Sequence, residues 1–115
     1  MSPQPMLYIL TNQKRGTLYV GVTRWPMQRI HQHREGLIEG FSKRYDTKNL
    51  VHYELFEAIT DAIAREKQVK GWRRAWKIEL VEQANPTWRD LALDFGFAPL
   101  REPRRTRMDP GSSPG

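Results

Sequence analysis

Two short apolar runs, separated by a polar stretch that ends in glycine, form the first regular pattern along the chain. Residues 6–11 are almost wholly apolar, which is typical of a central strand. Residues 17–23 are rich in β-branched and aromatic side chains and predict a second strand. The intervening residues 12–16 fit a hairpin loop, so we expect antiparallel pairing. Gly21, inside the second strand, indicates close approach of another backbone or a ligand.

A helix is expected directly after the second strand, because Pro26 suits the first turn of a helix and Gly36 suits its end. Arg29 and His33 are four residues apart and therefore project from one face of this helix. The strand and the helix together bring Tyr19, Arg29 and His33 into one neighbourhood. This grouping suits phosphate chemistry.

Residues 37–46 read as a loop in which basic and aromatic side chains interleave. Lys43 and Arg44 lie between Phe41 and Tyr45, a composition that favours contact with nucleic-acid phosphates. The alternative is a solvated loop whose two aromatic rings are buried in the core. The residue pattern leaves both interpretations open.

A third strand is predicted over residues 50–57. Simple alternation places His52 and Glu54 on one face, and Val51 and Tyr53 on the other.

The next helix, expected to start at Thr60 and to break near Gly71, carries one unusual residue. Glu66 falls between Ile63 and Val69 on the apolar stripe. A carboxylate is costly to bury unless it is paired or bound to a metal. It is therefore either an ion-pair partner or a ligand. Basic residues crowd the same stretch and are candidate nucleic-acid contacts: Lys70, Arg73, Arg74 and Lys77.

A further helix of about ten residues is expected around residues 76–81. Asn85 and Pro86 then read as the N-cap and first position of a short terminal helix over residues 88–95. From residue 96 to 115 the composition turns to Arg, Pro, Gly and Ser, which predicts a disordered basic tail.

Composition limits the classes of protein that remain. A chain of 115 residues with 38% hydrophobic content supports one domain, expected at 6–95 after a short extension at 1–5. The net charge of +6 favours an acidic partner, most simply nucleic acid. No cysteine is present, which excludes disulfides, thiol nucleophiles and zinc–thiolate sites. With no long apolar run and no signal-peptide pattern, we expect a cytoplasmic protein that does not enter membranes.

One set of residues stands in a characteristic order and approximate spacing: Tyr8, Tyr19-Val20-Gly21, Arg29, His33, Glu66 and Asn85. These motifs resemble those of the GIY-YIG nuclease superfamily, and most closely its small single-domain bacterial members. The likeness covers residues 6–95, and only the first signature triplet, Met6-Leu7-Tyr8, departs from the pattern by lacking its glycine.

The resemblance implies an α+β fold with a three-stranded antiparallel sheet flanked by helices in the order β-β-α-β-α-α. It also implies metal-dependent hydrolysis of DNA phosphodiester bonds, of which structure-selective cutting in repair or recombination is one form. Glu66 is the expected ligand of Mg²⁺ or Mn²⁺, because one carboxylate suffices when phosphate and waters complete the shell. Arg29 is expected to bind phosphate oxygens.

Tyr8 and Tyr19 are the candidates for general base, and the sequence does not distinguish between them. His33 is expected to orient a tyrosine or to share the proton transfer. Asn85 either holds the site together or acts only as a helix cap. The competing function is a non-catalytic nucleic-acid-binding module, but such a module has no need of Glu66 beside phosphate. No small-molecule cofactor is expected, and both a monomer and a weak dimer remain open.

Overall fold

The computed structural model describes residues 2–38 and 40–100 and has an α+β architecture. Three strands, β1 (Met6–Thr11), β2 (Leu18–Thr23) and β3 (Asn49–Leu55), form an antiparallel sheet in the order β2-β1-β3. The expected three-stranded antiparallel sheet is therefore confirmed. The helices are α1 (Pro26–Arg34), α2 (Phe41–Arg44), α3 (Ile59–Lys70), α4 (Arg74–Ala84) and the 3₁₀ helix η1 (Leu91–Phe95).

The central strand is β1, and all of its residues are buried. Its apolar sequence follows from this position, because both of its edges are paired and both of its faces are covered. The pairing with β2 sets Tyr8 opposite Gly21 and Leu10 opposite Tyr19.

The third strand departs from simple alternation. Ile9 pairs with His52 and Leu10 with Leu50, so Val51 is an extra residue in β3. This bulge places Val51 in the apolar cluster that Phe56 also contacts, whereas Tyr53 joins the cluster on the other face. The predicted grouping of Val51 with Tyr53 is wrong for this reason.

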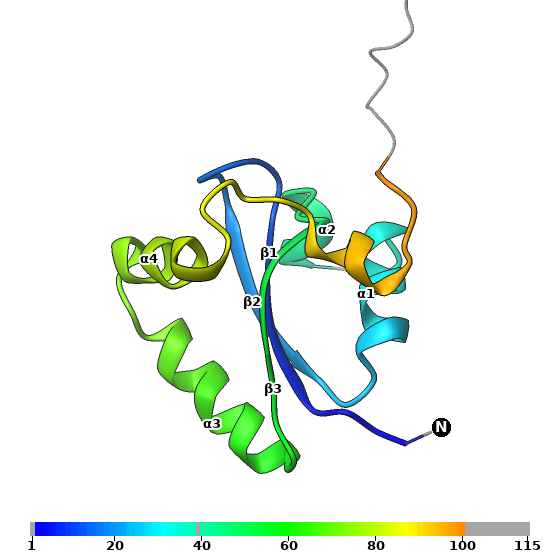
Figure 1. The fold of residues 1–115 in the computed structure, drawn as a ribbon, viewed down its shortest axis with the longest axis vertical. Coiled ribbons are helices and arrows are strands. Elements are labelled where there is room, and N and C mark those ends of the chain that lie inside the picture. Colours follow the sequence, from blue (N-terminus) through cyan, green and yellow to red (C-terminus); the bar gives the residue numbers. More distant parts are fainter. Residues whose placement is uncertain (1, 39, 101–115) are drawn as a thin grey trace, which may run out of the picture.

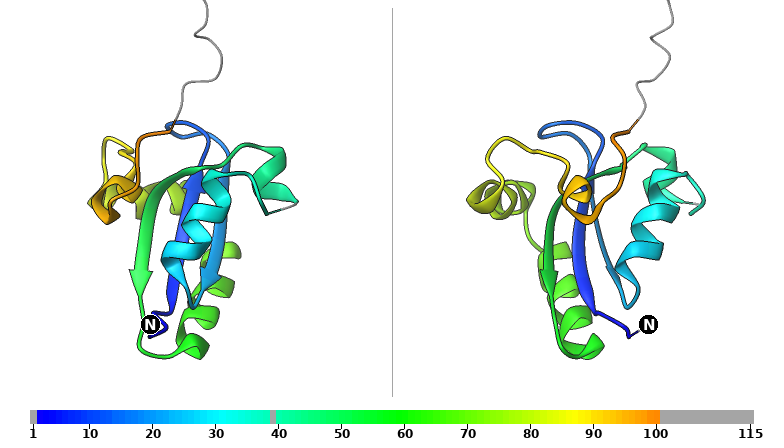
Figure 2. Two further views of the ribbon diagram at one scale, coloured as in Figure 1. Left: turned by 90° about the vertical axis from the view of Figure 1, so that its right-hand side faces the viewer. Right: turned by 45° about the vertical axis from the view of Figure 1, so that its right-hand side comes forward.

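Helices cover both faces of the sheet (Figure 1). On one face, α3 and α4 enclose a core around Leu7, Ile9 and Val20, to which Val69 and Val81 contribute. On the other face, α1 and η1 enclose a core that contains Tyr8, Leu10 and Ile30. The left view of Figure 2 shows the same three layers from the side of α1, with α3 behind the sheet.

Three local predictions require correction. The helix expected to be capped by Thr60 begins at Ile59, after Ala58, without a side-chain cap. The predicted loop at 37–46 contains the short helix α2. The terminal helix is not capped by Asn85, which instead closes the end of α4. The cap of this terminal helix, η1, is Asp90. Its carboxylate accepts a hydrogen bond from the Ala92 backbone N–H at 3.1 Å and so satisfies a donor at the start of the helix.

Packing continues past Phe95 along the chain. Phe97 lies against the core on the α1 side, and the guanidinium of Arg34 lies 5.7 Å from its ring centre. Arg34 also donates to the carbonyl of Ala98 and pairs with Asp90 at 2.8 Å. The tail predicted from residue 96 onward falls, from residue 101, outside the described residues. In the part of the chain that the structure covers, no helix is long and apolar enough to span a membrane.

Candidate active site

The site begins with a tyrosine whose hydroxyl end lies directly over a glycine. A Cβ atom at Gly21 would lie 2.5 Å from the ζ-carbon and 2.5 Å from the hydroxyl oxygen of Tyr8. Gly21 is therefore required because the side chain of the opposite strand occupies the space above it. The sequence indicated a close approach here, but by a backbone or a ligand rather than by a tyrosine.

His33 holds the far end of the Tyr8 side chain. The Tyr8 hydroxyl lies 3.0 Å from Nε2 of His33, and the side chains of both residues are buried. Tyr19 completes the cluster, with its ring centre 6.2 Å from Tyr8 and 5.3 Å from His33. Tyr19 is only half-buried, so it is the tyrosine of this pair that faces solvent.

Burial controls the protonation of the two enclosed groups. It raises the pKa of Tyr8 above the usual value for a phenol, the neighbouring Tyr19 adds to this effect, and the cation of Arg29 partly opposes it. Burial and the same Arg29 cation lower the pKa of His33 to about 4. At neutral pH both groups are therefore uncharged, and a hydrogen bond joins the Tyr8 hydroxyl to Nε2 of His33.

Arg29 joins the cluster from α1, where it precedes His33 by one helical turn. Its side chain is half-buried beside the Tyr8 hydroxyl and also lines a small hollow of about 170 Å³ with Trp25 and Gln28. A fixed guanidinium at such an opening is suited to binding phosphate oxygens.

Glu66 is contributed by a different element, α3. It lies on the stripe of α3 that faces the sheet, between the buried residues Ala62 and Val69. α3 packs on the face of the sheet opposite to α1, so Glu66 and Arg29 are contributed by helices on opposite faces (Figure 1). Its carboxylate, with a side chain 16% exposed, pairs at 3.0 Å with Lys70, one turn later.

The geometry around Glu66 fits a metal ion only in part. Over residues 2–38 and 40–100, no three His, Asp or Glu side chains gather to hold a metal. A single carboxylate remains sufficient where a phosphate and waters supply the other ligands. The strand nearest to α3 is β2, which has a free edge, and turns of α3 show beyond that edge in the left view of Figure 2.

Asn85 is a buried structural link on the α4 side. Its side-chain amide donates to the carbonyls of Val51, at 3.1 Å, and Arg89, at 2.9 Å. Its oxygen accepts from the Arg89 backbone N–H at 3.0 Å. These bonds fix the turn after α4 against the bulged part of β3.

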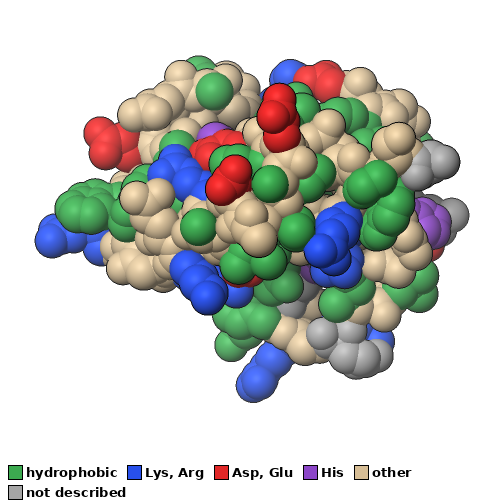
Figure 3. Space-filling model, turned by 90° about the horizontal axis from the view of Figure 1, so that it is seen from below, with side chains coloured by type: hydrophobic (Ala, Val, Ile, Leu, Met, Phe, Trp, Pro, Cys, Tyr) green, Lys and Arg blue, Asp and Glu red, His purple; other side chains and the backbone are tan. Residues whose placement is uncertain are grey.

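The basic residues predicted as nucleic-acid contacts are dispersed. Lys70 pairs with Glu66, Arg73 lies over the ring of Trp76, and Arg74 donates to the Arg15 carbonyl. Lys77 is half-buried on α4. On the face shown in Figure 3, basic side chains are spread among acidic and apolar ones.

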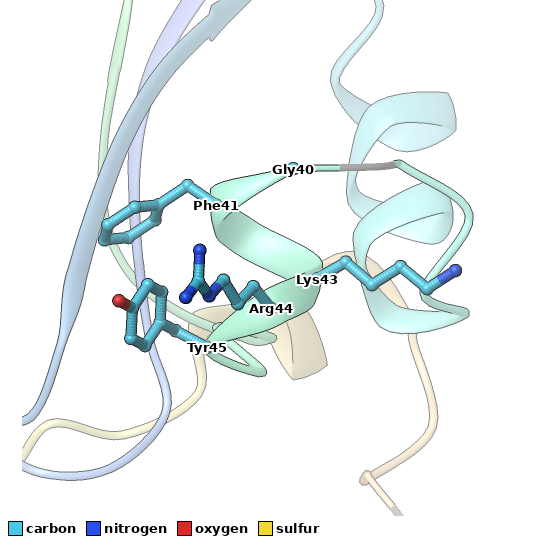
Figure 4. Close-up of a pocket in the computed structure, with 5 residues that line it drawn as sticks. All are labelled: Gly40, Phe41, Lys43, Arg44 and Tyr45. Carbon is cyan, nitrogen blue, oxygen red and sulfur yellow. The ribbon is translucent and has the colours of Figure 1, made fainter.

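The pair Lys43 and Arg44 also separates. Figure 4 shows Arg44 on the side of α2 that carries Phe41 and Tyr45, and Lys43 on the other side. Phe41 is 47% exposed and Tyr45 is 43% exposed, so the alternative of two buried aromatic rings is wrong. Their interleaving with basic residues was the sequence signal for a surface role.

Comparison with known proteins agrees with this arrangement. A family model described as the GIY-YIG catalytic domain matches residues 4–79. A UPF0213 protein of Syntrophus aciditrophicus is 33% identical over 81 residues, which cover 70% of this chain and 91% of the relative. UPF0213 proteins of Haloquadratum walsbyi and Staphylococcus aureus are 30% and 28% identical over 58% and 59% of this chain, and over 75% and 83% of their own lengths.

No solved structure matches. The family model nevertheless spans the whole sheet, α1 and α3, and therefore includes each strand and helix that contributes to the tyrosine cluster. On this match the chain belongs to the GIY-YIG catalytic domain family.

Proposed function

We propose that this protein is a divalent-metal-dependent endonuclease that hydrolyses phosphodiester bonds in DNA. The observation that carries the proposal is the convergence of Tyr8, Tyr19, Arg29 and His33 on one face of the sheet. Two strands and one helix contribute these groups, and together they offer proton transfer beside a phosphate-binding cation.

We assign the proton transfer to Tyr19. The Tyr8 hydroxyl is buried and hydrogen-bonded to His33, and its raised pKa opposes ionisation. Tyr19 is within reach of solvent and therefore of an attacking water. In this assignment Tyr19 acts as a phenolate that has released its own proton to solvent. It takes the proton of the attacking water, and solvent protonates the leaving sugar oxygen. Arg29 stabilises the charge that develops on the phosphoryl oxygens, and Tyr8 with His33 fixes the position of the Tyr19 ring.

Glu66 is the residue that would hold Mg²⁺ or Mn²⁺, with substrate phosphate and waters as the remaining ligands. The bound ion would supply charge neutralisation and a more acidic water. Lys70 does not prevent this role, because its side chain is 54% exposed and can turn away from the carboxylate. The role requires substrate to reach Glu66 around the free edge of β2.

Two observations favour the competing function, a DNA-binding module without catalysis. Glu66 is already paired with Lys70, and its helix α3 covers the face of the sheet opposite to α1, which carries Arg29. A chain that had lost the metal site would retain the tyrosine cluster as packing. Cytoplasmic location, a role in repair or recombination, and a monomeric or weakly dimeric state all remain predictions.

The test compares Glu66→Gln and Arg29→Ala with the wild-type protein on DNA in Mg²⁺, Mn²⁺ or EDTA. Glu66→Gln should abolish cleavage and preserve DNA binding in EDTA, because the ligand is lost and one negative charge is removed. Arg29→Ala should lower both cleavage and binding. The matched control is Glu79→Gln, which removes an exposed carboxylate from α4 and should cleave normally.

If Glu66 serves only as an ion-pair partner, the outcome is different. The Lys70 partner of this i,i+4 pair is 54% exposed and the pair is therefore open to solvent on one side, so Glu66→Gln would lose at most about 1 kcal/mol of stability and still cleave. Undiminished cleavage by this variant would refute the assignment of the metal. A wild-type protein that binds DNA without cutting it would instead establish the binding module.

A further inference from the structure

The short helix α2 exposes two aromatic rings that pack against each other instead of entering the core. Phe41 and Tyr45 are 47% and 43% exposed, and their ring centres are 4.7 Å apart. We refer to these two residues as the aromatic platform. Exposed aromatic side chains that lie side by side usually mark a binding surface.

The aromatic platform is continuous with the candidate active site. Phe41 stacks on Tyr19, with ring centres 6.0 Å apart and an angle of 26° between the ring planes. Tyr19 in turn lies 5.3 Å from His33. A row of rings thus leads from the buried tyrosine and histidine to the surface of α2, so a group bound on the platform would adjoin the proposed site of cleavage.

The platform also carries a positive charge. The guanidinium of Arg44 lies 5.7 Å from the ring centre of Tyr45, and Figure 4 shows it on the same side of α2 as both rings. These side chains line an open hollow of about 710 Å³. Flat apolar rings beside a guanidinium match a nucleotide, whose base stacks on the rings while its phosphate pairs with the cation.

We propose that the aromatic platform binds an unpaired nucleobase of the DNA strand to be cut, with Arg44 on an adjoining phosphate. This inference rests on the proposed function and defines its substrate class. Bases within a duplex already have both faces stacked, so only an unpaired or displaced base offers a free face to Phe41. The preferred substrate is therefore DNA with an unpaired stretch beside the scissile phosphate.

Binding is measured by fluorescence anisotropy in EDTA, where no cleavage occurs. Three labelled ligands of equal length are compared: a thymidine oligonucleotide, the same backbone with abasic residues throughout, and a duplex. The variants are Phe41→Ala and Tyr45→Ala. The matched control is Trp76→Ala, which removes another exposed aromatic ring that stacks with an arginine, on α4.

Phe41→Ala and Tyr45→Ala should each weaken binding to the thymidine oligonucleotide by about fivefold or more, as loss of a stacked base requires. Binding to the abasic and duplex ligands should change less than twofold. Equal losses on all three ligands, or an equal loss in Trp76→Ala, would overturn the proposal.

Cleavage assays keep this proposal separate from the nuclease assignment. A wild-type protein that binds single strands through Phe41 and cuts nothing would support the platform and refute the endonuclease. A protein that cuts DNA, but whose Phe41→Ala and Tyr45→Ala variants bind every ligand as wild type does, would refute the platform alone.

Discussion

The contact between Tyr8 and Gly21 yields a sharp prediction for Gly21→Ala. The added Cβ atom would lie 2.5 Å from the end of the Tyr8 ring, whereas carbon atoms in contact are usually about 3.5 Å apart. The ring must therefore move by about 1 Å. Tyr8 is only 1% exposed, so the surrounding core must move with it.

The expected cost has two parts. Overpacking of a core costs about 1–3 kcal/mol. Displacement of Tyr8 also disrupts its 3.0 Å hydrogen bond to His33 inside the core, which costs about 1–2 kcal/mol more. Intrinsic preference acts in the opposite direction, since alanine is favoured over glycine inside a strand by about 0.5–1 kcal/mol. We expect a net loss of about 2–3 kcal/mol, or a fall in Tm of at least about 10 °C.

Thermal and urea unfolding followed by circular dichroism measure this loss. The control is Gly71→Ala, because Gly71 has an ordinary φ of −78° and its added Cβ would meet nothing closer than 3.5 Å. The substitution is then repeated with Tyr8→Leu, which removes the obstructing ring. In that background Gly21→Ala should cost at least about 1 kcal/mol less. An equal cost in both backgrounds, or no more cost than Gly71→Ala, would refute the contact.

Two further substitutions test the environments of buried polar groups. The pKa of His33 is lowered to about 4 in the folded protein. Between about pH 6.5 and pH 4 the imidazole is therefore protonated in the unfolded chain but not in the folded protein. The free energy of unfolding should decline as the pH falls through this range, by up to about 3 kcal/mol. Urea titrations should show most of this slope lost in His33→Gln, and an unchanged slope would contradict the assignment. Asn85→Ala should cost about 2–4 kcal/mol through three lost hydrogen bonds, against at most about 1 kcal/mol for the exposed Asn12→Ala. If Asn85→Ala stays folded but loses cleavage, Asn85 acts in catalysis as well as in folding.

Local sequence signals predicted the parts of the fold that depend on neighbouring residues. The apolar run of β1, the polar hairpin loop and the helix between Pro26 and Gly36 were all readable in this way. The same signals misassigned Asn85, because an Asn-Pro pair usually starts a helix. Its amide instead reaches the carbonyl of Val51, a partner that no local pattern reveals.

The candidate site was predictable to the same extent. Spacing along α1 placed Arg29 and His33 on one face, and strand pairing brought Tyr8 and Tyr19 together. Spacing along α3 placed Glu66 on a buried stripe, as expected. The spacing of residues did not specify which face of the sheet α3 covers, because the direction of the connection from β3 to α3 decides the face.

The central position of β1 has a consequence for synthesis of the chain. One edge of β1 can pair with β2 as soon as the residues that follow directly are made. The other edge stays unpaired until β3 is made, whose Leu55 pairs with Met6. Until β3 leaves the ribosome, an apolar strand presents unpaired N–H and C=O groups. Nascent chains that end before Asn49 should therefore be the species most prone to aggregation and most dependent on chaperones.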